Sequence, residues 1–376
     1  MKPLRVLLIT DFAPNIVNAG SERLVFGIAQ GLNKQYAVKA DILAPNWNNL
    51  PEEEVVDGVT IHRFKTHSIR TLNSSNAARR VFDFMRFGAK LGRYDLYQGF
   101  YTLPPLMAAV LLAKFMQSKS IITFFGREQL EKRLTKLAKF PILAVLNCAD
   151  KITTYTWKLA SYFSEKAYFK NKAITTIQGW GDTELKVTGH TMVRTTPKEK
   201  IILFVGRLAK EKGVYVLLNA FSKIKARGSA KLVLIGPPYE EENVKREIKR
   251  LGIGNKVNIL GFVSDEDLEY WYLHSYVVAV PALHRDGFGL SLMEAMVRGK
   301  PIIGTEGVGT PDNTQELGII EPGDAVALAD YLEKMLTDKT FYSKCLENAK
   351  ARSKLFIKEQ VIKKYYSTYL ATLNNK

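Results

Sequence analysis

Two short blocks of this chain combine charged side chains with glycines in a way that suits a phosphorylated sugar. Residues 203–213 place Arg207 and Lys212 in a glycine-flanked turn. Residues 286–294 place the carboxylates of Asp286 and Glu294 around a glycine-rich turn that runs into a helix. Arginine binds phosphate through a bidentate fork, lysine binds it as a point charge, and carboxylates accept hydrogen bonds from sugar hydroxyls. Together the two blocks predict a clamp for a sugar attached to a diphosphate.

Both blocks directly follow a strand-like apolar run, and this position matters for ligand binding. Ligands of open α/β sheets bind beyond the carboxyl ends of the strands. Lys212 also lies just before a predicted helix, near the positive end of its dipole. Each block has a plainer interpretation when it is taken alone: Arg207 and Lys212 as surface cations of a loop, and Glu294 as a surface residue of a capped helix.

Apolar strand-like runs alternate with helix-like segments along the whole chain. Such alternation is typical of βαβ units around a parallel sheet. Strands are predicted at residues 4–10, 40–44, 59–64, 96–100, 121–125, 152–156, 201–205, 231–235, 257–262, 277–280 and 302–304. Helices are predicted at residues 21–32, 214–225, 240–251, 325–336, 341–354 and 359–373.

The alternating pattern falls into two series, which predicts an α/β fold of two tandem Rossmann-like, doubly wound domains facing a cleft. The length of 376 residues fits two domains of ~150 residues each. Residues 1–182 would form the first domain and residues 183–356 the second. The polar residues 183–200 show no sustained apolar periodicity and are interpreted as the linker and a hinge.

The net charge of +17 is concentrated most clearly in the first half of the chain, at residues 62–93 and 114–139. An anionic membrane surface, a nucleic acid or an anionic acceptor could each bind such a basic face. The alternative is that this lysine-rich surface is only solvated and binds no partner. Aromatic residues near positions 82–87 and at Phe140 lie among these cations. They are interpreted either as core packing or as an interfacial membrane face.

Several classes of protein and site are not indicated. The two cysteines, Cys148 and Cys345, are too few for a disulfide framework. They are interpreted as buried small side chains, and their small number fits a reducing, cytoplasmic setting. The longest uncharged apolar run, residues 101–113, falls short of the ~20 residues of a membrane-spanning helix. No signal peptide, metal-ligand spacing of histidines or Walker-type phosphate loop is recognised.

The two blocks resemble the signature sequences of glycosyltransferase family 4. Residues 205–213 read Val-Gly-Arg-Leu-Ala-Lys-Glu-Lys-Gly, and residues 286–295 read Asp-Gly-Phe-Gly-Leu-Ser-Leu-Met-Glu-Ala. Residues 20–23, 179–183, 301–304 and 321–324 are similar to further family segments, so the resemblance covers nearly the whole chain. Members of this family are retaining nucleotide-sugar transferases of the two-domain GT-B fold. In such enzymes the last helix returns to the first domain, which assigns residues 357–376 to that domain.

The resemblance also implies roles for individual residues. Arg207 and Lys212 would bind the donor diphosphate, Asp286 would meet the hydroxyls of the transferred sugar, and these three are the predicted catalytic residues. Glu294 would bind the ribose. The glycines would permit close approach of the backbone, and the amides of residues 288–290 would lie along the sugar and phosphates. The predicted donor-binding set is Gly20, Gly206, Arg207, Lys212, Asp286, Gly287, Phe288, Gly289, Leu290 and Glu294.

The chain departs from the family pattern at Ala19, where the family usually has the first glycine of a pair, and at two positions that bear more directly on the chemistry. The family usually has Glu where this chain has Asp286, whose side chain is one methylene shorter. The family often has His at the end of a first-domain strand, where this chain has Phe125. The imidazole that is often placed near the donor sugar would then be missing, and Arg127 or Glu128 is a candidate to replace it.

The resemblance, together with the two charged blocks, implies a retaining, metal-independent glycosyltransferase without a cofactor. It would move a hexose-type sugar from a nucleotide diphosphate to an acceptor hydroxyl on a membrane-associated glycan or lipid-linked oligosaccharide. The expected location is the cytoplasm, with peripheral contact to the anionic inner face of the membrane. The alternative is a nucleotide-sugar-binding partner or scaffold with little catalysis. The further hypothesis of a nucleic-acid-binding protein is based on charge alone, because the sequence contains no nucleic-acid-binding motif.

Overall fold

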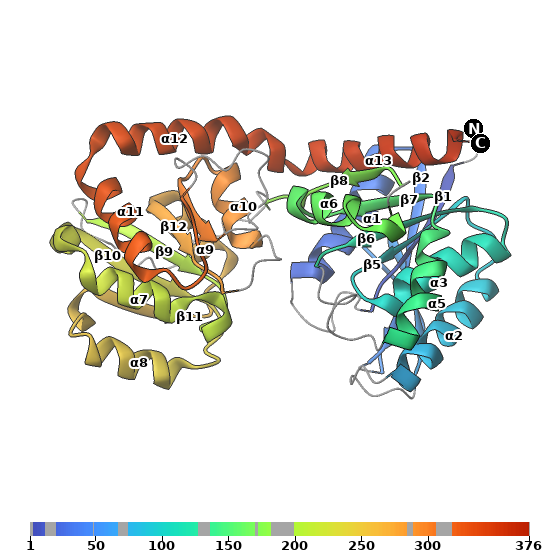
Figure 1. The fold of residues 1–376 in the computed structure, drawn as a ribbon, viewed down its shortest axis with the longest axis horizontal. Coiled ribbons are helices and arrows are strands. Elements are labelled where there is room, and N and C mark those ends of the chain that lie inside the picture. The colour runs from blue at the N-terminus through green and yellow to red at the C-terminus, as the bar shows by residue number, and fades with distance from the viewer. Residues whose placement is uncertain are drawn as a thin grey trace. The chain divides into compact units, whose positions relative to one another are not determined.

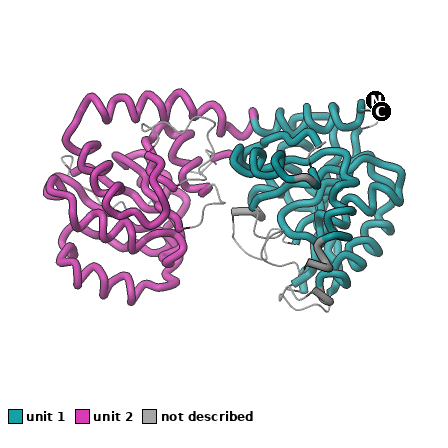
Figure 2. Tube along the Cα trace, viewed as in Figure 1, with its two compact units in different colours: residues 1–178, 361–376 teal, residues 179–360 magenta. Residues whose placement is uncertain are grey.

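The computed structural model describes residues 3–11, 20–47, 49–66, 74–126, 136–169, 172–181, 199–283, 289–305 and 318–375. The chain forms two compact units (Figure 2). Unit 1 consists of Met1–Gln178 and Val361–Lys376, and unit 2 of Gly179–Gln360. The division falls at 178/179 and 360/361, whereas the sequence pattern places it at 182/183 and 356/357.

Unit 1 is built on an eight-stranded sheet with the order β3-β4-β2-β1-β5-β6-β7-β8 (Figure 1). Its neighbouring strands are parallel except for the β3–β4 pair at one edge. The strands are β1 (Leu4–Ile9), β2 (Val38–Asn46), β3 (Glu53–Val56), β4 (Val59–Lys65), β5 (Leu96–Phe100), β6 (Lys119–Phe124), β7 (Lys151–Thr154) and β8 (Ile174–Thr176). The helices are α1 (Gly20–Gln35), α2 (Ser74–Lys90), α3 (Leu103–Phe115), α5 (Lys136–Asn147), α6 (Trp157–Ser164) and most of α13 (Lys358–Asn374).

Unit 2 is built on a six-stranded, all-parallel sheet with the order β11-β10-β9-β12-β13-β14. The strands are β9 (Lys200–Val205), β10 (Ala230–Ile235), β11 (Val257–Gly261), β12 (Ser275–Val280), β13 (Ile302–Thr305) and β14 (Ile319–Ile320). The helices are α7 (Val214–Lys223), α8 (Glu241–Arg250), α9 (Asp265–His274), α10 (Leu290–Val297), α11 (Ala325–Thr337) and α12 (Lys339–Ser353), and η2 (Lys210–Lys212) is a 3-10 turn.

Helices cover the sheet of unit 1 on both faces, as a doubly wound fold requires. On one face, α2, α3 and α5 bury side chains such as Phe84, Leu112 and Leu146 against the strands. On the other face, Gln98 of β5 accepts a hydrogen bond from the hydroxyl of Tyr369 of α13. The continuous apolar runs of the central strands are therefore buried from both sides, which explains their sequence pattern.

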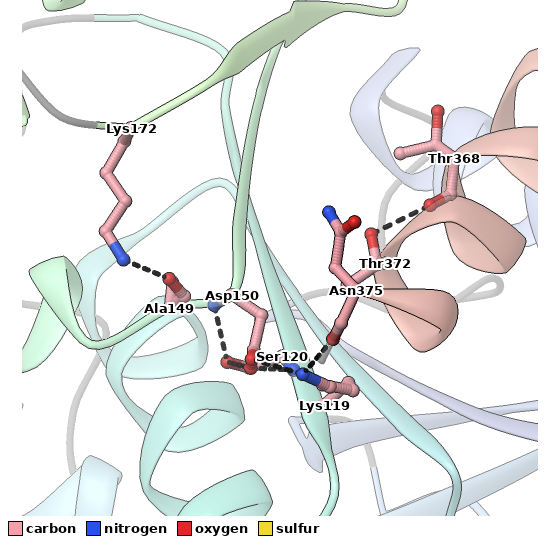
Figure 3. A network of polar contacts seen from close by, with 8 residues as sticks. All are labelled: Lys119, Ser120, Ala149, Asp150, Lys172, Thr368, Thr372 and Asn375. Atoms are coloured by element: carbon pink, nitrogen blue, oxygen red, sulfur yellow. Dashed lines mark hydrogen bonds and ion pairs between the residues drawn. The ribbon is translucent and has the colours of Figure 1, made fainter.

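The returning helix α13 is tied to unit 1 at its carboxyl end (Figure 3). The Nζ of Lys119, at the start of β6, donates a hydrogen bond of 2.8 Å to the carbonyl of Asn375. The same ammonium lies 3.3 Å from a carboxylate oxygen of Asp150, and this carboxylate accepts hydrogen bonds from the amide and hydroxyl of Ser120. A cation beside the last carbonyls of a helix also stabilises the helix dipole.

Two expectations about membranes and cysteines can be compared with the described residues. No helix in these ranges is both long enough and apolar enough to cross a bilayer. Cys345 is buried, as the sequence predicts, but the prediction for Cys148 is wrong: it is exposed, because α5 ends one residue before it and the chain turns there on the surface.

Candidate functional site

The first charged block and the described part of the second both belong to unit 2, and each comes after a strand of its sheet. Counted along the chain, its strands have the order 3-2-1-4-5-6 of doubly wound nucleotide-binding sheets. The order reverses between β9 and β12, and such sheets bind ligands beyond the carboxyl ends of the strands at this point. Residues 206–213 follow β9 and residues 281–289 follow β12. The strand order therefore brings the chain that leaves β12 beside the chain that leaves β9.

Direct backbone contacts join the two loops. The amide of Leu283 donates a hydrogen bond of 3.0 Å to the carbonyl of Glu211. Gly213 has φ +77°, and a Cβ placed there would lie 1.8 Å from the carbonyl oxygen of Pro281. Only glycine permits this approach without a backbone shift. The turn that carries Lys212 is thus fixed against the segment that leads to Asp286.

Arg207 is held at the surface of this edge by two contacts. Its guanidinium forms an ion pair of 3.2 Å with Glu211, four residues further along the chain, and its side chain is 45% exposed. The guanidinium also lies over the ring of Tyr239, 5.4 Å from its centroid. An exposed ion pair contributes little to stability, so the arrangement orients the fork while leaving it accessible to an anion.

Lys212 differs from Arg207 in its surroundings. It is half-buried, and in the described part of the chain its ammonium makes no hydrogen bond or ion pair. Burial and the neighbouring charge of Arg207 lower the pKa of Lys212, and Glu211 opposes this shift. A partly buried ammonium beside a second cation favours the binding of a phosphate. The anion would offset both the desolvation of Lys212 and its repulsion by Arg207.

Glu240 braces the turn between these two cations. One of its carboxylate oxygens accepts a hydrogen bond of 3.0 Å from the amide of Lys210, and the other accepts one of 2.7 Å from the hydroxyl of Tyr215. These two bonds lower the pKa of Glu240. Burial, together with the hydrogen bond to Glu240, raises the pKa of Tyr215 to about 12. The sequence did not single out Glu240, because it opens a run of three glutamates that reads as a solvated helix start.

Helix α10 begins with Gly289 as its N-cap. The amides of Leu290 and Ser291 have no acceptor among the residues that the structure describes, as is usual in the first turn of a helix. Such amides can bind an anion. The position after β12 therefore adds donors to the edge that already carries Arg207 and Lys212.

Glu294 lies in the second turn of α10 and is half-buried. Its carboxylate accepts a hydrogen bond of 2.7 Å from the hydroxyl of Tyr272, which comes from α9. Burial, and then the charge of Glu294, raise the pKa of Tyr272 well above its ordinary value, so the phenol stays protonated and donates. Tyr272 thus fixes the orientation of Glu294. No sequence pattern points to Tyr272, because its contact with Glu294 is between two helices.

Part of the predicted site lies outside the described residues, namely Asp286, Gly287 and Phe288. The same is true of the linker residues 183–198, and of Arg127 and Glu128. Gly20 is described only as the first residue of α1, which belongs to unit 1. Gly206 follows β9, and its amide bonds the carbonyl of Ile235, 2.9 Å away.

Two exposed aromatic side chains follow the neighbouring strands of the same sheet. Tyr239 comes after β10 and is 67% exposed, and Phe262 comes after β11 and is 77% exposed. An exposed aromatic face can stack on a nucleobase. The sequence could have pointed to both residues, because each lies within four residues of the carboxyl end of a predicted strand of this sheet.

Phe125 lies at the corresponding edge of the unit 1 sheet, after β6. Its ring packs 5.6 Å from that of Tyr101 and 4.9 Å from that of Tyr155. Tyr101 has φ +75°, a strained conformation for a residue with a side chain. The position where the family pattern has His is therefore part of an aromatic cluster.

A buried ion pair lies at the end of β1 in the same unit. The carboxylate of Asp11 is bound by the guanidinium of Arg80 and the hydroxyl of Thr102. Burial lowers the pKa of Arg80. These contacts tie α2 and α3 to the end of β1. Within the described ranges, no three His, Cys, Asp or Glu side chains gather as metal ligands would.

The chain is similar to known glycosyltransferases in sequence. Residues 192–352 match the family model described as "Glycosyl transferases group 1". An uncharacterised glycosyltransferase of Methanocaldococcus jannaschii is 32% identical over 44% of this chain and 43% of its own length. The O-antigen chain mannosyltransferase C of Escherichia coli is 24% identical over 95% of each chain. A 2-deoxystreptamine N-acetyl-D-glucosaminyltransferase of Niallia circulans is 31% identical over 37% of this chain and 37% of its own length. The alignments with the Methanocaldococcus and Niallia proteins thus span less than half of those relatives.

Solved structures match over almost the whole chain. Sucrose-phosphate synthase of Thermosynechococcus elongatus has a TM-score of 0.80 at 19% identity, covering 99% of this chain and all of that one. HepE of Anabaena, solved in complex with UDP-glucose, has a TM-score of 0.69 at 17% identity, covering 98% of this chain and all of that one. At such identities the likeness shows the fold.

Proposed function

We propose, from the premise that this chain belongs to the glycosyl transferases group 1 family and has the GT-B fold, that it is a retaining hexosyltransferase. It moves a hexose-type sugar from a nucleotide diphosphate to an acceptor hydroxyl. A relative named for mannosyl transfer to an O-antigen chain, and a neighbour of like fold that contains UDP-glucose, support this choice of substrates.

One observation carries the proposal: Lys212 is half-buried beside the guanidinium of Arg207 at the switch point of unit 2, and its ammonium has no partner among the described residues. Two cations in this position suit a diphosphate better than a neutral ligand, and the first-turn amides of α10 can add hydrogen bonds. Asp286 and Glu294 bind the sugar and the ribose. Gly20, Gly287 and the amide of Phe288 complete the proposed donor site.

In the proposed reaction, the bond between the anomeric carbon and the diphosphate oxygen breaks while the acceptor oxygen bonds to that carbon on the same face. The proton of the acceptor hydroxyl passes to an oxygen of the departing diphosphate. The products are a glycoside and a nucleoside diphosphate. Arg207 and Lys212 stabilise the negative charge that develops on the leaving group. Because these cations supply that stabilisation, the proposed reaction needs no metal ion.

For the acceptor, we propose a glycan or lipid-linked oligosaccharide that is held at the cytoplasmic face of a membrane. The name of the O-antigen relative and the basic surface of unit 1 support this proposal. An acceptor of this kind remains at the membrane, so an enzyme that acts on it benefits from peripheral attachment.

The proposal is tested by incubating the protein with radiolabelled UDP-, GDP- and dTDP-sugars, with and without membrane lipid extracts. Label should move into the lipid or glycan fraction, or at least be released by donor hydrolysis, with one donor preferred. The anomeric configuration of the product is then read by NMR spectroscopy. Absence of both transfer and hydrolysis across the panel would count against an enzyme.

The aromatic cluster around Phe125 favours a second candidate, a nucleotide-sugar-binding protein with little catalysis. The cluster has Phe125 at the position where the family resemblance places an imidazole near the donor sugar. Calorimetry that finds tight donor binding in a protein without turnover would favour this candidate. Gain of activity in Phe125→His would support it further.

A further inference from the structure

Three neighbouring helices of unit 1 share one outer surface. Helix α3 packs against both α2 and α5 (Figure 1). The inner side chains of all three helices are buried in clusters with the strands. Their other sides are therefore directed away from the sheet. This outer surface is called the α2–α3–α5 face below.

The α2–α3–α5 face exposes large aromatic side chains, one on each helix. Phe82 of α2 is 64% exposed, Phe115 of α3 is 69% exposed, and Phe140 of α5 is 82% exposed. Few phenylalanines are exposed to this extent on a surface that faces only water. Three exposed phenylalanines on adjacent helices indicate a surface that binds another molecule when the protein functions.

Aliphatic side chains continue this apolar character along α3. Leu103, Met107 and Leu111 are half-buried and follow one another at intervals of four residues, and Phe115 extends the series. Residues at this spacing lie on the same side of a helix. Leu103 and Met107 also pack against the buried cluster beneath α3, so the middle helix presents a stripe of partly exposed apolar side chains.

The charges of the face are almost all positive. The exposed residues of α2 include Arg79, Arg86 and Lys90, and Lys114 is exposed at the end of α3. Asp83 is the one acidic residue in the sequence of the three helices, and its carboxylate accepts a hydrogen bond from Thr66. No exposed side chain described on these helices is acidic. Exposed phenylalanines flanked by arginine and lysine suit the boundary between lipid headgroups and acyl chains.

We propose that the α2–α3–α5 face docks unit 1 on an anionic lipid bilayer. Arg79, Arg86 and Lys90 contact lipid phosphates, while Phe82 and Phe140 insert among the acyl chains. The aliphatic stripe on α3 favours lipid over nucleic acid, because a nucleic acid offers no apolar phase to cover it. Docking involves unit 1 residues alone and does not depend on the donor chemistry of unit 2.

The test is flotation of the full-length protein with vesicles of phosphatidylglycerol and phosphatidylcholine, compared with vesicles of phosphatidylcholine alone. Two variants carry the proposal. Removing three cations in R79A/R86A/K90A should lower partitioning to anionic vesicles roughly 100-fold. Removing the aromatic rings in F82S/F140S should lower it by about tenfold or more. Binding by the unmodified protein should also weaken in 1 M salt.

Matched controls come from elsewhere in the chain. Val55 of β3 is 67% exposed, and Val55→Ser should leave vesicle binding unchanged. The variant K249A/K344A/K354A removes three exposed cations from unit 2 and should also bind normally. Unchanged melting temperatures show that each variant is folded. Donor hydrolysis without vesicles should be equal in all of them, which separates docking from the proposed reaction.

Three results would overturn the proposal. The first is negligible flotation of the unmodified protein with both kinds of vesicle. The second is tight binding to double-stranded DNA that the cation variant loses and the aromatic variant keeps, which would indicate a nucleic acid. The third is a concentration-dependent dimer in sedimentation that F82S/F140S abolishes, with no vesicle binding, which would indicate a second copy of this chain.

Discussion

The lowered pKa of Lys212 predicts an alkaline limit to activity. Lys212 must be protonated to bind the diphosphate, so kcat/KM should fall as pH rises through a pKa below its ordinary 10.5. Lys212→Arg should move this limb to higher pH, because a guanidinium stays charged. Lys212→Ala should lose on the order of 100-fold in kcat/KM. A pH–rate profile of the three proteins checks this, with Lys210→Ala in the same turn as the control.

The same pKa shift has a consequence for stability with a defined sign. Between the lowered pKa and 10.5, the folded protein binds fewer protons at Lys212 than the unfolded chain does. The contribution of this residue to the free energy of unfolding should therefore increase as pH rises through that window. Denaturant titrations of the unmodified protein and Lys212→Arg should diverge there. Parallel curves would contradict the assigned pKa direction.

Lys212 and Glu240 differ in how far each could be predicted from the sequence. Lys212 could be located because a cation between a strand and a helix lies at the ligand edge of a parallel sheet. Glu240 could not, because its role depends on two tertiary hydrogen bonds, to Lys210 and Tyr215. Tyr272, which orients Glu294, was missed for the same reason. Periodicity locates residues along an element and does not identify their partners.

Glu240 is predicted to act by positioning the cationic turn. Glu240→Ala should lower kcat/KM about tenfold, because the turn loses two hydrogen bonds of about 1 kcal/mol each. Glu240→Gln retains one carbonyl acceptor and should recover part of the loss. Glu242→Ala removes a side chain that is 82% exposed on the same helix and serves as the control. Equal activity in all three would remove Glu240 from the site.

At the scale of elements, the strands were predicted except for β3, β8 and β14, which are short strands at the sheet edges, whereas several helices were missed. Strand β5 agrees residue for residue with the predicted 96–100. Helix α3 was not predicted, because its apolar run contains two prolines. These lie in the first turn, where a missing amide costs no hydrogen bond. Strand β3, Glu-Glu-Val-Val, is an exposed edge whose alternation is too short to recognise, and β14 has two residues.

The packing of α13 against α1 yields a prediction about stability. A Cβ on Gly31 would lie 2.7 Å from Cγ1 of Ile362, so Gly31→Val should force the two helices apart. Such overpacking costs about 1–3 kcal/mol. It should lower the melting temperature by several degrees. Gly228→Val, where nothing lies within 4 Å of the added Cβ, should leave the melting temperature nearly unchanged.

At the scale of the whole molecule, the two units share one plan. Counted along the chain, the parallel strands of unit 1 begin with the same 3-2-1-4-5-6 order, followed by β8, and carry β3 as an antiparallel edge. The sequence predicted this architecture because alternation of buried strands and helices is its direct signature. The antiparallel edge strand and the residues that face each switch point could not be predicted from the sequence and were identified only in the structure.

Two measurements on the intact protein follow from the proposed chemistry. If Arg207 and Lys212 supply the charge that the diphosphate needs, an excess of EDTA should leave transfer and hydrolysis unchanged. A matching donor should raise the melting temperature, by an amount equivalent to about 2.7 kcal/mol at 100 times its Kd. Activity that disappears with EDTA and returns with a divalent ion would contradict the metal-independent reaction.

The return of α13 to unit 1 constrains how the protein is made. Residues 361–376 complete a unit whose other part ends at Gln178, so the ribosome synthesises all of unit 2 before the first unit can close. At ~5–20 residues per second this delay is on the order of ten seconds or more. During that time the groove for Tyr365 and Tyr369 is uncovered, while unit 2 can already fold. The nascent chain therefore presents an apolar surface to chaperones at a defined stage of translation.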